Sequence, residues 1–360
     1  MRSLCRTARM RRWRLDTAPR RRRAGVTMTD VARRAGVSTM TVSNVINGRS
    51  QRVSEPTKRR VLSVIAELGY QVNLTARNLR MGRTGAVGLA VPGFAPGYYA
   101  QLADRLASRF AAHGLRLAVE RTGASRSAEL DALTASRLSG YDGFVLSVVA
   151  GDVTDLDHLS VDAPVVLIGE RAVPARFDHV LMDNVGGARL ATELLIRTGA
   201  RRIALLGGVR VAEGSMQGLR TRGYRDAHEA VGTAVGNELI VSCGFGVEDG
   251  YEAVRDLIGR GVLFDAIFAL TDSAAIGALR ALAEAGRKVP EDVQVVGFDN
   301  LDDGRFTVPS LTTVEPGNAE MADAVCTLLL ERMASRPAPV SARVVMPEAR
   351  IVERETTRRA

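Results

Sequence analysis

The chain has 360 residues, of which 46% are hydrophobic and 25% are charged, a balance typical of a globular protein with two or three domains. No apolar run approaches the roughly 18–20 residues that span a membrane. Three scattered cysteines are too few for a disulfide framework or a cysteine-based metal cluster. We therefore expect a cytoplasmic protein that needs neither a cofactor nor a metal.

The formal net charge of +9 is unevenly distributed along the chain. Residues 1–25 carry +9 and residues 26–82 carry +6, whereas the remaining residues carry −6. This asymmetry is typical of a modular DNA-binding protein, because only one end needs to attract phosphates. The arginine-rich residues 1–25 lack the apolar segment of a signal peptide, and we expect them to be a disordered basic extension.

The region after the basic extension shows the signals of three short helices. Thr27, Ser38 and Ser54 are the expected N-caps, and Gly36 ends the first helix. Apolar residues at helical spacing give the second and third helices one buried face each. These residues are Val42, Val45 and Ile46, followed by Val61, Ile65 and Leu68. Three such helices predict a helix-turn-helix DNA-binding headpiece at residues 26–72.

The segments TDVARRAGVSTMTVSNVING, VSEPTKRRVLSVIAELGYQVN and ARNLR resemble the headpiece of the lactose and galactose repressor (LacI/GalR) family. The resemblance implies that Thr39, Met40 and Asn44 face base edges in the major groove, where Met40 offers an apolar contact. The alternative is a solvated helix face that contacts no DNA. The residues expected to bind DNA in the headpiece are Thr27, Ser38, Thr39, Met40, Thr41, Ser43, Asn44, Asn47 and Ser54.

Residues 73–83 are the expected hinge. They have little apolar surface and are too short to form a stable helix alone. In the family the corresponding segment orders on DNA and pairs with its dimer mate in the minor groove. The resemblance implies that Leu79 is wedged between base pairs and that the small Ala76 permits close approach of the two hinges. Asn73 and Arg77 complete the expected DNA-binding residues, and a plain flexible linker is the alternative.

Beyond the hinge, short apolar runs alternate with helical stretches, which predicts a parallel α/β architecture. YDGFVLSV at 141–148 and FDAIFALT at 264–271 echo each other and predict two similarly built lobes. DNVGGARLATELLIRTGARRIALLGG and VVGFDN also resemble the family, whose core is periplasmic-binding-protein-like, with parallel sheets flanked by helices. By this resemblance the chain crosses between the lobes three times. The expected lobes are residues 84–184 with 314–337, and residues 185–313 with 338–356.

The cleft between two such lobes normally takes a small polyhydroxylated or heterocyclic molecule. The resemblance implies that Asp299, at the carboxyl end of a strand, and Arg220, in LRTRGYRDA, share the recognition of hydroxyl groups. The alternative is that these two residues only pair with each other to hold the lobes together. The other effector-binding residues that the resemblance implies are Tyr98, Tyr99, Phe245 and Asp272, of which Tyr99 and Phe245 have a core aromatic role as their alternative. Gly169, Glu170, Ala200 and Thr271 depart from common family residues and leave the sugar specificity open.

Signatures of catalysis are absent from the sequence. It contains no Walker A motif, and GGVRVAEG is not a dinucleotide-binding turn. The four histidines show no catalytic or ligand spacing, and we expect them to be satisfied surface residues. They are His113, His158, His179 and His228.

The combined pattern predicts a homodimeric repressor, not an enzyme. We expect it to bind a pseudo-palindromic operator DNA and to respond to a small-molecule effector, a sugar or related metabolite, without any membrane partner. Two alternatives stay open at this point. One is a solute-binding protein, whose fold the core also resembles, and the other is a global regulator controlled by a protein partner.

Overall fold

The structure is a computed structural model of the chain, in which two compact units can be separated, Met1–Arg80 and Met81–Ala360. It describes residues 26–46, 53–70, 83–94, 97–151, 155–156, 161, 163–170, 176–210, 214–334 and 341–359. Several predictions concern residues outside these ranges: the basic extension at 1–25, and Asn47, Asn73, Ala76, Arg77, Leu79 and His158. Within the described ranges, no helix is both long and apolar enough to cross a membrane.

The N-terminal unit contains α1 (Met28–Ala35), α2 (Thr39–Ile46) and α3 (Glu55–Leu68). The start of α1 is the predicted capping box. The Thr27 hydroxyl accepts the Asp30 N–H at 3.3 Å, and the Asp30 carboxylate accepts the Thr27 N–H at 3.0 Å. These two bonds satisfy N–H groups that have no partner inside the helix, so the sequence fixes this helix start locally.

The three helices bury a small apolar core. Val42 and Val45 of α2 are buried, as predicted from their spacing. The buried face of α3 differs from the prediction, because Val61 and Val64 are buried while Ile65 is only half-buried. Residues three apart lie on the same helix face, so the stripe that faces α1 and α2 runs through Val64.

Ser54 stands at the N-cap position of α3, but its hydroxyl does not cap the helix backbone. It donates instead to the Thr57 hydroxyl at 3.0 Å. Pro56 occupies the second position of the helix and has no N–H, which removes one of the two groups that an N-cap side chain normally accepts.

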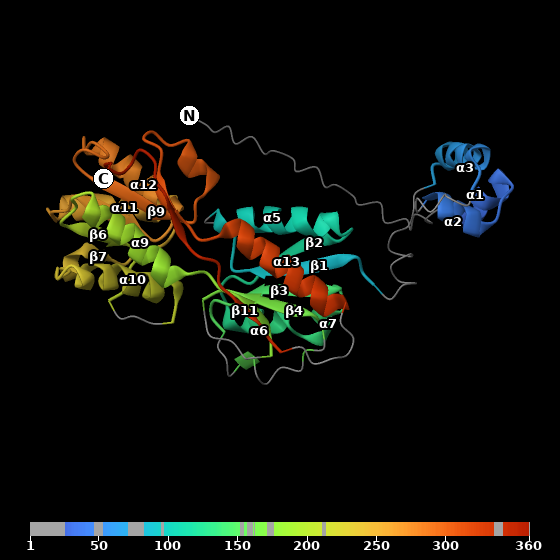
Figure 1. Ribbon diagram of the computed structural model, residues 1–360, viewed down its shortest axis with the longest axis horizontal. Helices are drawn as coiled ribbons and strands as arrows, with labels where there is room; N and C mark the ends of the chain where they lie inside the picture. The colour runs from blue at the N-terminus through green and yellow to red at the C-terminus, as the bar shows by residue number, and fades with distance from the viewer. Residues whose placement is uncertain are drawn as a thin grey trace, which may run out of the picture. The chain divides into compact units, whose positions relative to one another are not determined.

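The C-terminal unit consists of two lobes, each built on a six-stranded sheet (Figure 1). The sheet orders, β11-β5-β4-β3-β1-β2 and β12-β10-β9-β8-β6-β7, correspond position by position. All pairs are parallel except β12, which runs antiparallel to β10. The N-terminal lobe contains β1 (Ala86–Val91), β2 (Arg116–Arg121), β3 (Gly143–Ser147), β4 (Val165–Ile168), β5 (Asp178–Val180) and β11 (Val344–Val345). The C-terminal lobe contains β6 (Ile203–Leu206), β7 (Ile240–Val241), β8 (Ala266–Ala269), β9 (Gln294–Phe298), β10 (Thr312–Glu315) and β12 (Arg350–Val352).

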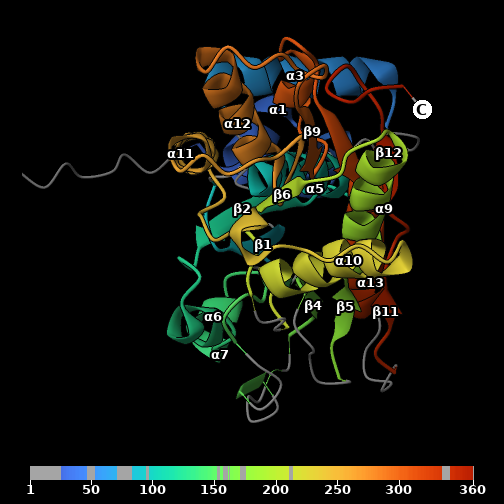
Figure 2. The ribbon, with the colours of Figure 1, turned by 90° about the vertical axis from the view of Figure 1, so that its left-hand side faces the viewer.

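Helices cover both faces of each sheet (Figures 1 and 2), which explains why the central strands are continuous apolar runs. In the N-terminal lobe, α5 (Tyr98–Ala112) and α13 (Asn318–Ala334) cover one face, and α6 (Arg126–Ala132) and α7 (Ala135–Leu138) cover the other. In the C-terminal lobe these places are taken by α9 (Asn184–Arg197) with α10 (Met216–Ala230), and by α11 (Val247–Gly259) with α12 (Asp272–Glu284). Two short 3₁₀ turns, η2 (Asn237–Leu239) and η3 (Asp302–Arg305), complete the C-terminal lobe.

The two echoing sequence segments form β3 and β8, which occupy the same position in their sheets. The aspartate in each segment has the same role. Asp142 accepts the N–H groups of the two residues that precede β1, at 2.5 and 2.9 Å. Asp265 accepts the N–H groups of the two residues that precede β6, at 2.9 to 3.0 Å. The prediction of two similarly built lobes is therefore confirmed.

The chain passes between the lobes three times, after β5, after β10 and after β11. The predicted third crossing near residue 338 is too early. β11 (Val344–Val345) still pairs with β5 of the N-terminal lobe, and only β12 returns to the C-terminal lobe. Two residues of edge strand carry too little periodic signal to be assigned to a sheet from sequence.

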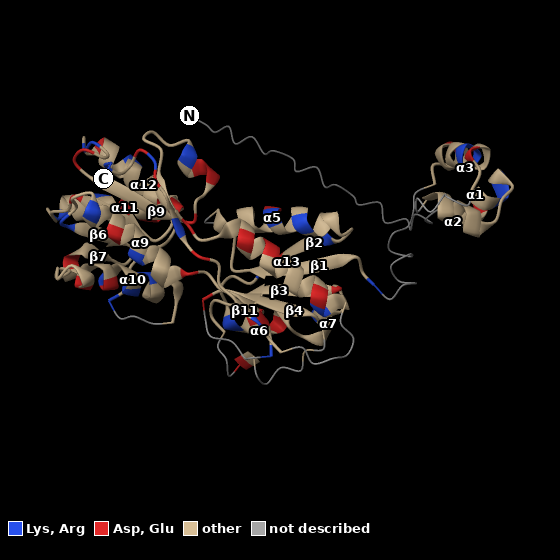
Figure 3. Ribbon diagram, viewed as in Figure 1, with Lys and Arg blue, Asp and Glu red and all other residues tan. Residues whose placement is uncertain are grey.

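Basic and acidic residues are interspersed along the helices of both lobes (Figure 3). Many form surface pairs along one helix, such as Arg280 with Glu284 at 2.6 Å and Arg255 with Glu252 at 3.4 Å. Such exposed pairs contribute little to stability, because water and salt screen them. The mixed pattern agrees with the slightly acidic composition of this unit.

Candidate functional site

The exposed side of α2 carries the residues that were expected to read bases. Thr39 is exposed, Met40 is 71% exposed, and Asn44 is half-buried. Val42 and Val45 fill the opposite side and anchor the helix to the headpiece core. A large apolar side chain that stays this exposed in a small domain is available for contact with another molecule.

Ser38 fixes the start of α2, as predicted. Its hydroxyl accepts the Thr41 N–H at 3.0 Å and lies 2.9 Å from the Thr41 hydroxyl. Both hydroxyls therefore serve the helix start in this structure. Ser43 is half-buried on the same helix.

Arg220 lies on α10 with only 3% of its side chain exposed. Its Nε donates to the Asn184 side chain at 2.7 Å, and one terminal nitrogen donates to the Leu270 carbonyl. The guanidinium also stacks on the Phe298 ring, 3.5 Å from the ring centre. Because donors and acceptors meet on several sides, the planar group is held in one orientation.

Asp299 follows β9 and faces Arg220 at the carboxyl ends of the strands. The distance between its Oδ1 and the Arg220 Nη2 is 3.5 Å, and only 4% of the Asp299 side chain is exposed. Burial raises the pKa of Asp299 to about 7, although the Arg220 charge opposes the change. This long contact therefore compensates only part of the cost of burying the carboxylate.

Tyr98 and Tyr99 begin α5 in the other lobe, with ring centres 5.1 Å apart in an edge-to-face arrangement. The Tyr99 hydroxyl lies 3.2 Å from the Ser147 hydroxyl at the end of β3. Burial raises the pKa of both tyrosines, and the charges of Asp299 and Arg220 act on both. The aromatic pair of one lobe therefore lies near the charged pair of the other, and these four residues form the candidate interlobe site.

Phe245 and Asp272 are placed differently from the residues above. Phe245 is half-buried in the loop after β7, and its carbonyl accepts the Thr271 hydroxyl at 2.8 Å. Asp272 is fully buried, and both of its carboxylate oxygens have partners inside the C-terminal lobe. They accept the Thr313 hydroxyl at 2.5 Å and the Leu301 N–H at 2.7 Å. Both oxygens are thus engaged within the lobe, and a contact of Asp272 with an effector stays a prediction.

Comparison with known proteins agrees with both units. Residues 27–73 match the family model of bacterial regulatory proteins, lacI family, and residues 192–357 match that of a periplasmic binding protein-like domain. The ribose operon repressor of Halalkalibacterium halodurans is 31% identical over 92% of this chain and 97% of its own length. The chain belongs to the LacI family. Members of this family are transcriptional regulators, not enzymes.

Two solved structures extend the comparison of this LacI-family chain. A complex of the transcriptional regulator CelR with cellobiose is 32% identical, covers 92% of this chain and 99% of that one, and has a TM-score of 0.64. The lac repressor dimer bound to operator and the anti-inducer ONPF is 25% identical, covers 92% and 99%, and has a TM-score of 0.75. These likenesses establish the fold and the regulator family.

Sequence reasoning missed three residues that shape the interlobe site of this LacI-family protein. Asn184 orients Arg220, Phe298 supports its guanidinium, and Ser147 contacts Tyr99. Asn184 and Phe298 lie inside segments that had been recognised, and Ser147 ends a predicted strand. Only their positions at strand and helix ends, where α/β folds gather ligands, marked them as candidates.

The histidine prediction is wrong for two of the described histidines. His179 is 2% exposed, and its Nε2 lies 2.9 Å from the Gly169 carbonyl oxygen. His228 is 5% exposed, and its Nδ1 lies 2.9 Å from the Thr233 hydroxyl. Burial lowers the pKa of both side chains, that of His179 to about 4. Both are therefore buried residues, and burial favours the neutral form of each ring.

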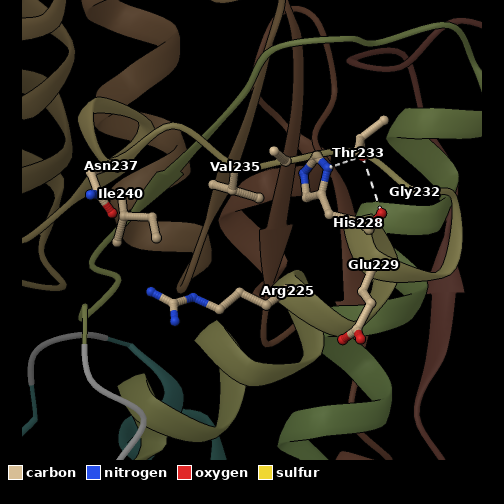
Figure 4. A pocket seen from close by; sticks show the side chains of 9 residues that line it. Arg225, His228, Glu229, Gly232, Thr233, Val235, Asn237 and Ile240 are labelled. Atoms are coloured by element: carbon tan, nitrogen blue, oxygen red, sulfur yellow. Dashed lines mark hydrogen bonds between the residues drawn. The ribbon is translucent and has the colours of Figure 1, made fainter.

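A cavity of about 530 Å³ lies at the C-terminal end of α10 and the loop that follows it (Figure 4). Arg225, Glu229 and Val235 belong to its lining, whereas the predicted effector residues do not. His228 also belongs to the lining, but its partnerless Nε2 is sealed from water. A molecule in the cavity has no access to that nitrogen, so the cavity offers no specific polar contact there.

Proposed function

We propose that this LacI-family protein is a dimeric cytoplasmic repressor whose affinity for a pseudo-palindromic operator changes when a sugar or related metabolite binds between its lobes. The observation that carries the proposal is the buried pair of Arg220 and Asp299 opposite Tyr98 and Tyr99. A charged pair at the carboxyl ends of parallel strands, facing aromatic rings, has the chemistry that recognises a polyhydroxylated molecule.

The chemistry of the pair suits hydroxyl groups. Carboxylate oxygens accept hydrogen bonds from hydroxyls, and a guanidinium donates to hydroxyl or ring oxygens. The 3.5 Å contact leaves Asp299 with an incompletely compensated charge, which additional donors from a ligand would stabilise. The CelR–cellobiose complex supports a sugar as the class of effector.

The site lies beside two crossings between the lobes. Arg220 contacts Met182 and Asn184, which belong to the first crossing. At the second crossing, the Asn318 side chain donates a hydrogen bond to the Asp299 carbonyl at 2.7 Å. A molecule bound there contacts the segments that must bend when the lobes rotate. Such a molecule controls operator affinity only if it binds the two lobe arrangements with different affinity.

The DNA-binding half of the proposal rests on α2. Thr39, Met40 and Asn44 would read bases, while basic residues of the headpiece supply salt-dependent affinity. The hinge residue Leu79 would open a base step in the minor groove, with Ala76 at the contact between the two hinges. The lac repressor dimer on operator DNA supports the dimeric arrangement.

The effector proposal is tested by thermal denaturation with cellobiose, ribose, other sugars, nucleosides and purines. An effector at a hundredfold excess over its dissociation constant should stabilise the parent protein by about 2.7 kcal/mol. Asp299→Asn should lose most of this stabilisation, whereas the matched variant Arg225→Ala, on the same helix as Arg220, should keep it. An effector that stabilises Asp299→Asn as well as the parent would remove Asp299 from the site.

The DNA-binding proposal is tested by selection of randomised operators. Met40→Ala should change the preference at one symmetric pair of operator positions by about 1–3 kcal/mol. Lys58→Ala should instead weaken all sequences equally and reduce the salt dependence. A uniform loss of affinity in Met40→Ala would contradict base reading by this residue.

A further inference from the structure

The turn after β9 has an unusual backbone. Asp299 and Asn300 are consecutive non-glycine residues with positive φ values, +112° and +50°. Such conformations are costly and persist only where the surrounding structure fixes them. Because this turn carries the Asp299 side chain toward Arg220, whatever fixes the turn also fixes that carboxylate.

Asp272 reaches this turn from the start of α12. Its Oδ2 accepts the Leu301 N–H at 2.7 Å, and its Oδ1 accepts the Thr313 hydroxyl at 2.5 Å. The Thr313 oxygen in turn accepts the Asn300 N–H at 3.3 Å. Asp272 therefore holds two consecutive N–H groups of the turn, one directly and one through Thr313.

The packing around Asp272 is tight. The side chain is fully buried, and a Cβ at Gly297 of β9 would lie 2.1 Å from its Oδ1. The strand must therefore carry a glycine where the carboxylate crosses it. A carboxylate in such a place is unfavourable unless fixed donors surround it, and the described donors are those of the turn and its neighbour Thr313.

The turn is also connected to the other lobe. The Asn318 side chain, at the start of α13, donates to the Asp299 carbonyl at 2.7 Å. The Asn300 side chain donates to Glu315 at 2.7 Å, and Glu315 accepts the Asn318 N–H at 2.6 Å. A displacement of the turn therefore reaches the first residue of a helix that packs on the N-terminal lobe.

We propose that Asp272 is a positioning residue of the interlobe site. It sets the place of the Asp299 carboxylate through the backbone of Asn300 and Leu301 and does not contact the effector. Its connection to regulation rests on the proposed function, in which Asp299 binds the effector. Its action on the turn is a property of the protein alone and is tested without any sugar.

The test is hydrogen–deuterium exchange of the full chain, read at single residues. In Asp272→Ala the Leu301 N–H loses its acceptor and Asn300 loses the support of Thr313. We expect both amides to exchange about tenfold faster than in the parent, because each loses roughly one hydrogen bond. Asp272→Asn keeps an oxygen for Leu301 and an amide group for Thr313, so it should restore the protection.

Thr313→Val separates the two branches that hold the turn, the direct bond from Leu301 to Asp272 and the bond from Asn300 to Thr313. It also tests the proposal if Asp272→Ala does not fold. Valine has nearly the shape of threonine but no oxygen, so the Asn300 amide should exchange faster while the Leu301 amide stays protected. Faster exchange of both amides, or of neither, would show that the two branches do not hold the turn as described.

Asp265→Ala is the matched control. Asp265 belongs to the same lobe and also accepts two consecutive N–H groups, but it lies at the amino end of β8. This variant should melt at a lower temperature while the Asn300 and Leu301 amides stay protected. Unchanged protection in Asp272→Ala, or an equal loss in Asp265→Ala, would overturn the proposal. A missing response to sugars would contradict only the proposed function, because no sugar enters these measurements.

Discussion

The two lobes have the same strand order but carry different chemistry at the carboxyl ends of their strands. The N-terminal lobe presents the rings of Tyr98 and Tyr99, the hydroxyl of Ser147 and the half-buried Glu170, whose charge adds to burial in raising the pKa of both tyrosines and of Asp299. The C-terminal lobe presents Arg220 and Asp299, which are charged groups almost removed from water. The strand order that the lobes share determines where a site lies, and the residues that follow the strands determine the chemistry of that site.

At the amino ends of the strands the lobes are alike. Asp142 and Asp265 each hold the two residues that precede the first strand of their lobe. The repeated sequence segment thus contains a structural residue that both lobes keep, while the functional ends differ. The following variants test whether the two lobes are alike at the amino ends of their strands and different at the carboxyl ends.

The largest effect is expected for Arg220→Ala. Removing the guanidinium takes away the charged partner of Asp299 and the donor to the Asn184 side chain and the Leu270 carbonyl, which should lower the free energy of unfolding by about 3–5 kcal/mol in urea denaturation. Arg225→Ala, one turn further along α10 and half-buried, should cost less than about 1 kcal/mol. Equal losses in the two variants would mean that burial of the Arg220–Asp299 pair does not distinguish this end of the lobe.

The second test uses pH, because the lobes should respond with opposite sign. Burial lowers the pKa of His179, in the N-terminal lobe, to about 4, so between pH 6.5 and 4 the unfolded chain binds more protons than the folded one. His179 should therefore cost about 2–3 kcal/mol of stability as the pH falls through this window. His179→Gln, which keeps a donor for the Gly169 carbonyl, should lack this loss.

Asp299, in the C-terminal lobe, should behave in the opposite way. Its pKa of about 7 lies above its ordinary value of 3.8, so the folded protein binds the extra proton between these pH values. Its contribution to stability should therefore fall as the pH rises from 3.8 to 7. Subtracting the stability of the parent from that of His179→Gln and of Asp299→Asn, at each pH, should give two curves of opposite slope. Slopes of the same sign would contradict the assigned burial of one of the two residues.

A smaller and equal effect is expected at the amino ends. Asp142→Ala and Asp265→Ala each leave two N–H groups without their acceptor, and each should lower the free energy of unfolding by about 2 kcal/mol. Chemical denaturation of both single variants and of the double variant measures this. A difference of more than about 1 kcal/mol between the single variants would show that the two lobes are not equivalent at this end.

The smallest effect is expected for Tyr99→Phe. The change removes only the hydroxyl contact with Ser147, so the free energy of unfolding should fall by about 1 kcal/mol. The same substitution in a Ser147→Ala background should have almost no further effect. A full additional loss there would mean that Tyr99 acts through another contact.

Much of this architecture was predictable because its signals are local. Thr27 with Asp30 specifies the start of α1, and the spacing of Val42 and Val45 specifies the buried face of α2. Bonds within one turn and apolar spacing depend only on residues close in sequence. The two similar lobes were predictable for the same reason, because each of the two echoing segments is a single short stretch of sequence.

The failures concern residues whose surroundings come from distant segments. His179 was expected at the surface, but it lies in β5 between β4 and β11, and β11 comes from a distant part of the chain. β11 was placed in the wrong lobe because the strand with which it pairs, β5, lies more than a hundred residues earlier. Such placements depend on which long-range pairings the whole sheet selects.

Sequence alone determined the headpiece, the α/β core with two lobes, and the family resemblance that singled out Arg220 and Asp299. Only the tertiary structure decided that Asp272 is buried and accepts hydrogen bonds from the Leu301 N–H and the Thr313 hydroxyl. An aspartate at the start of a helix can face a ligand or a neighbouring backbone with the same local sequence. The choice is made by Gly297, Leu301 and Thr313, which approach from other strands and loops and supply the space and the donors.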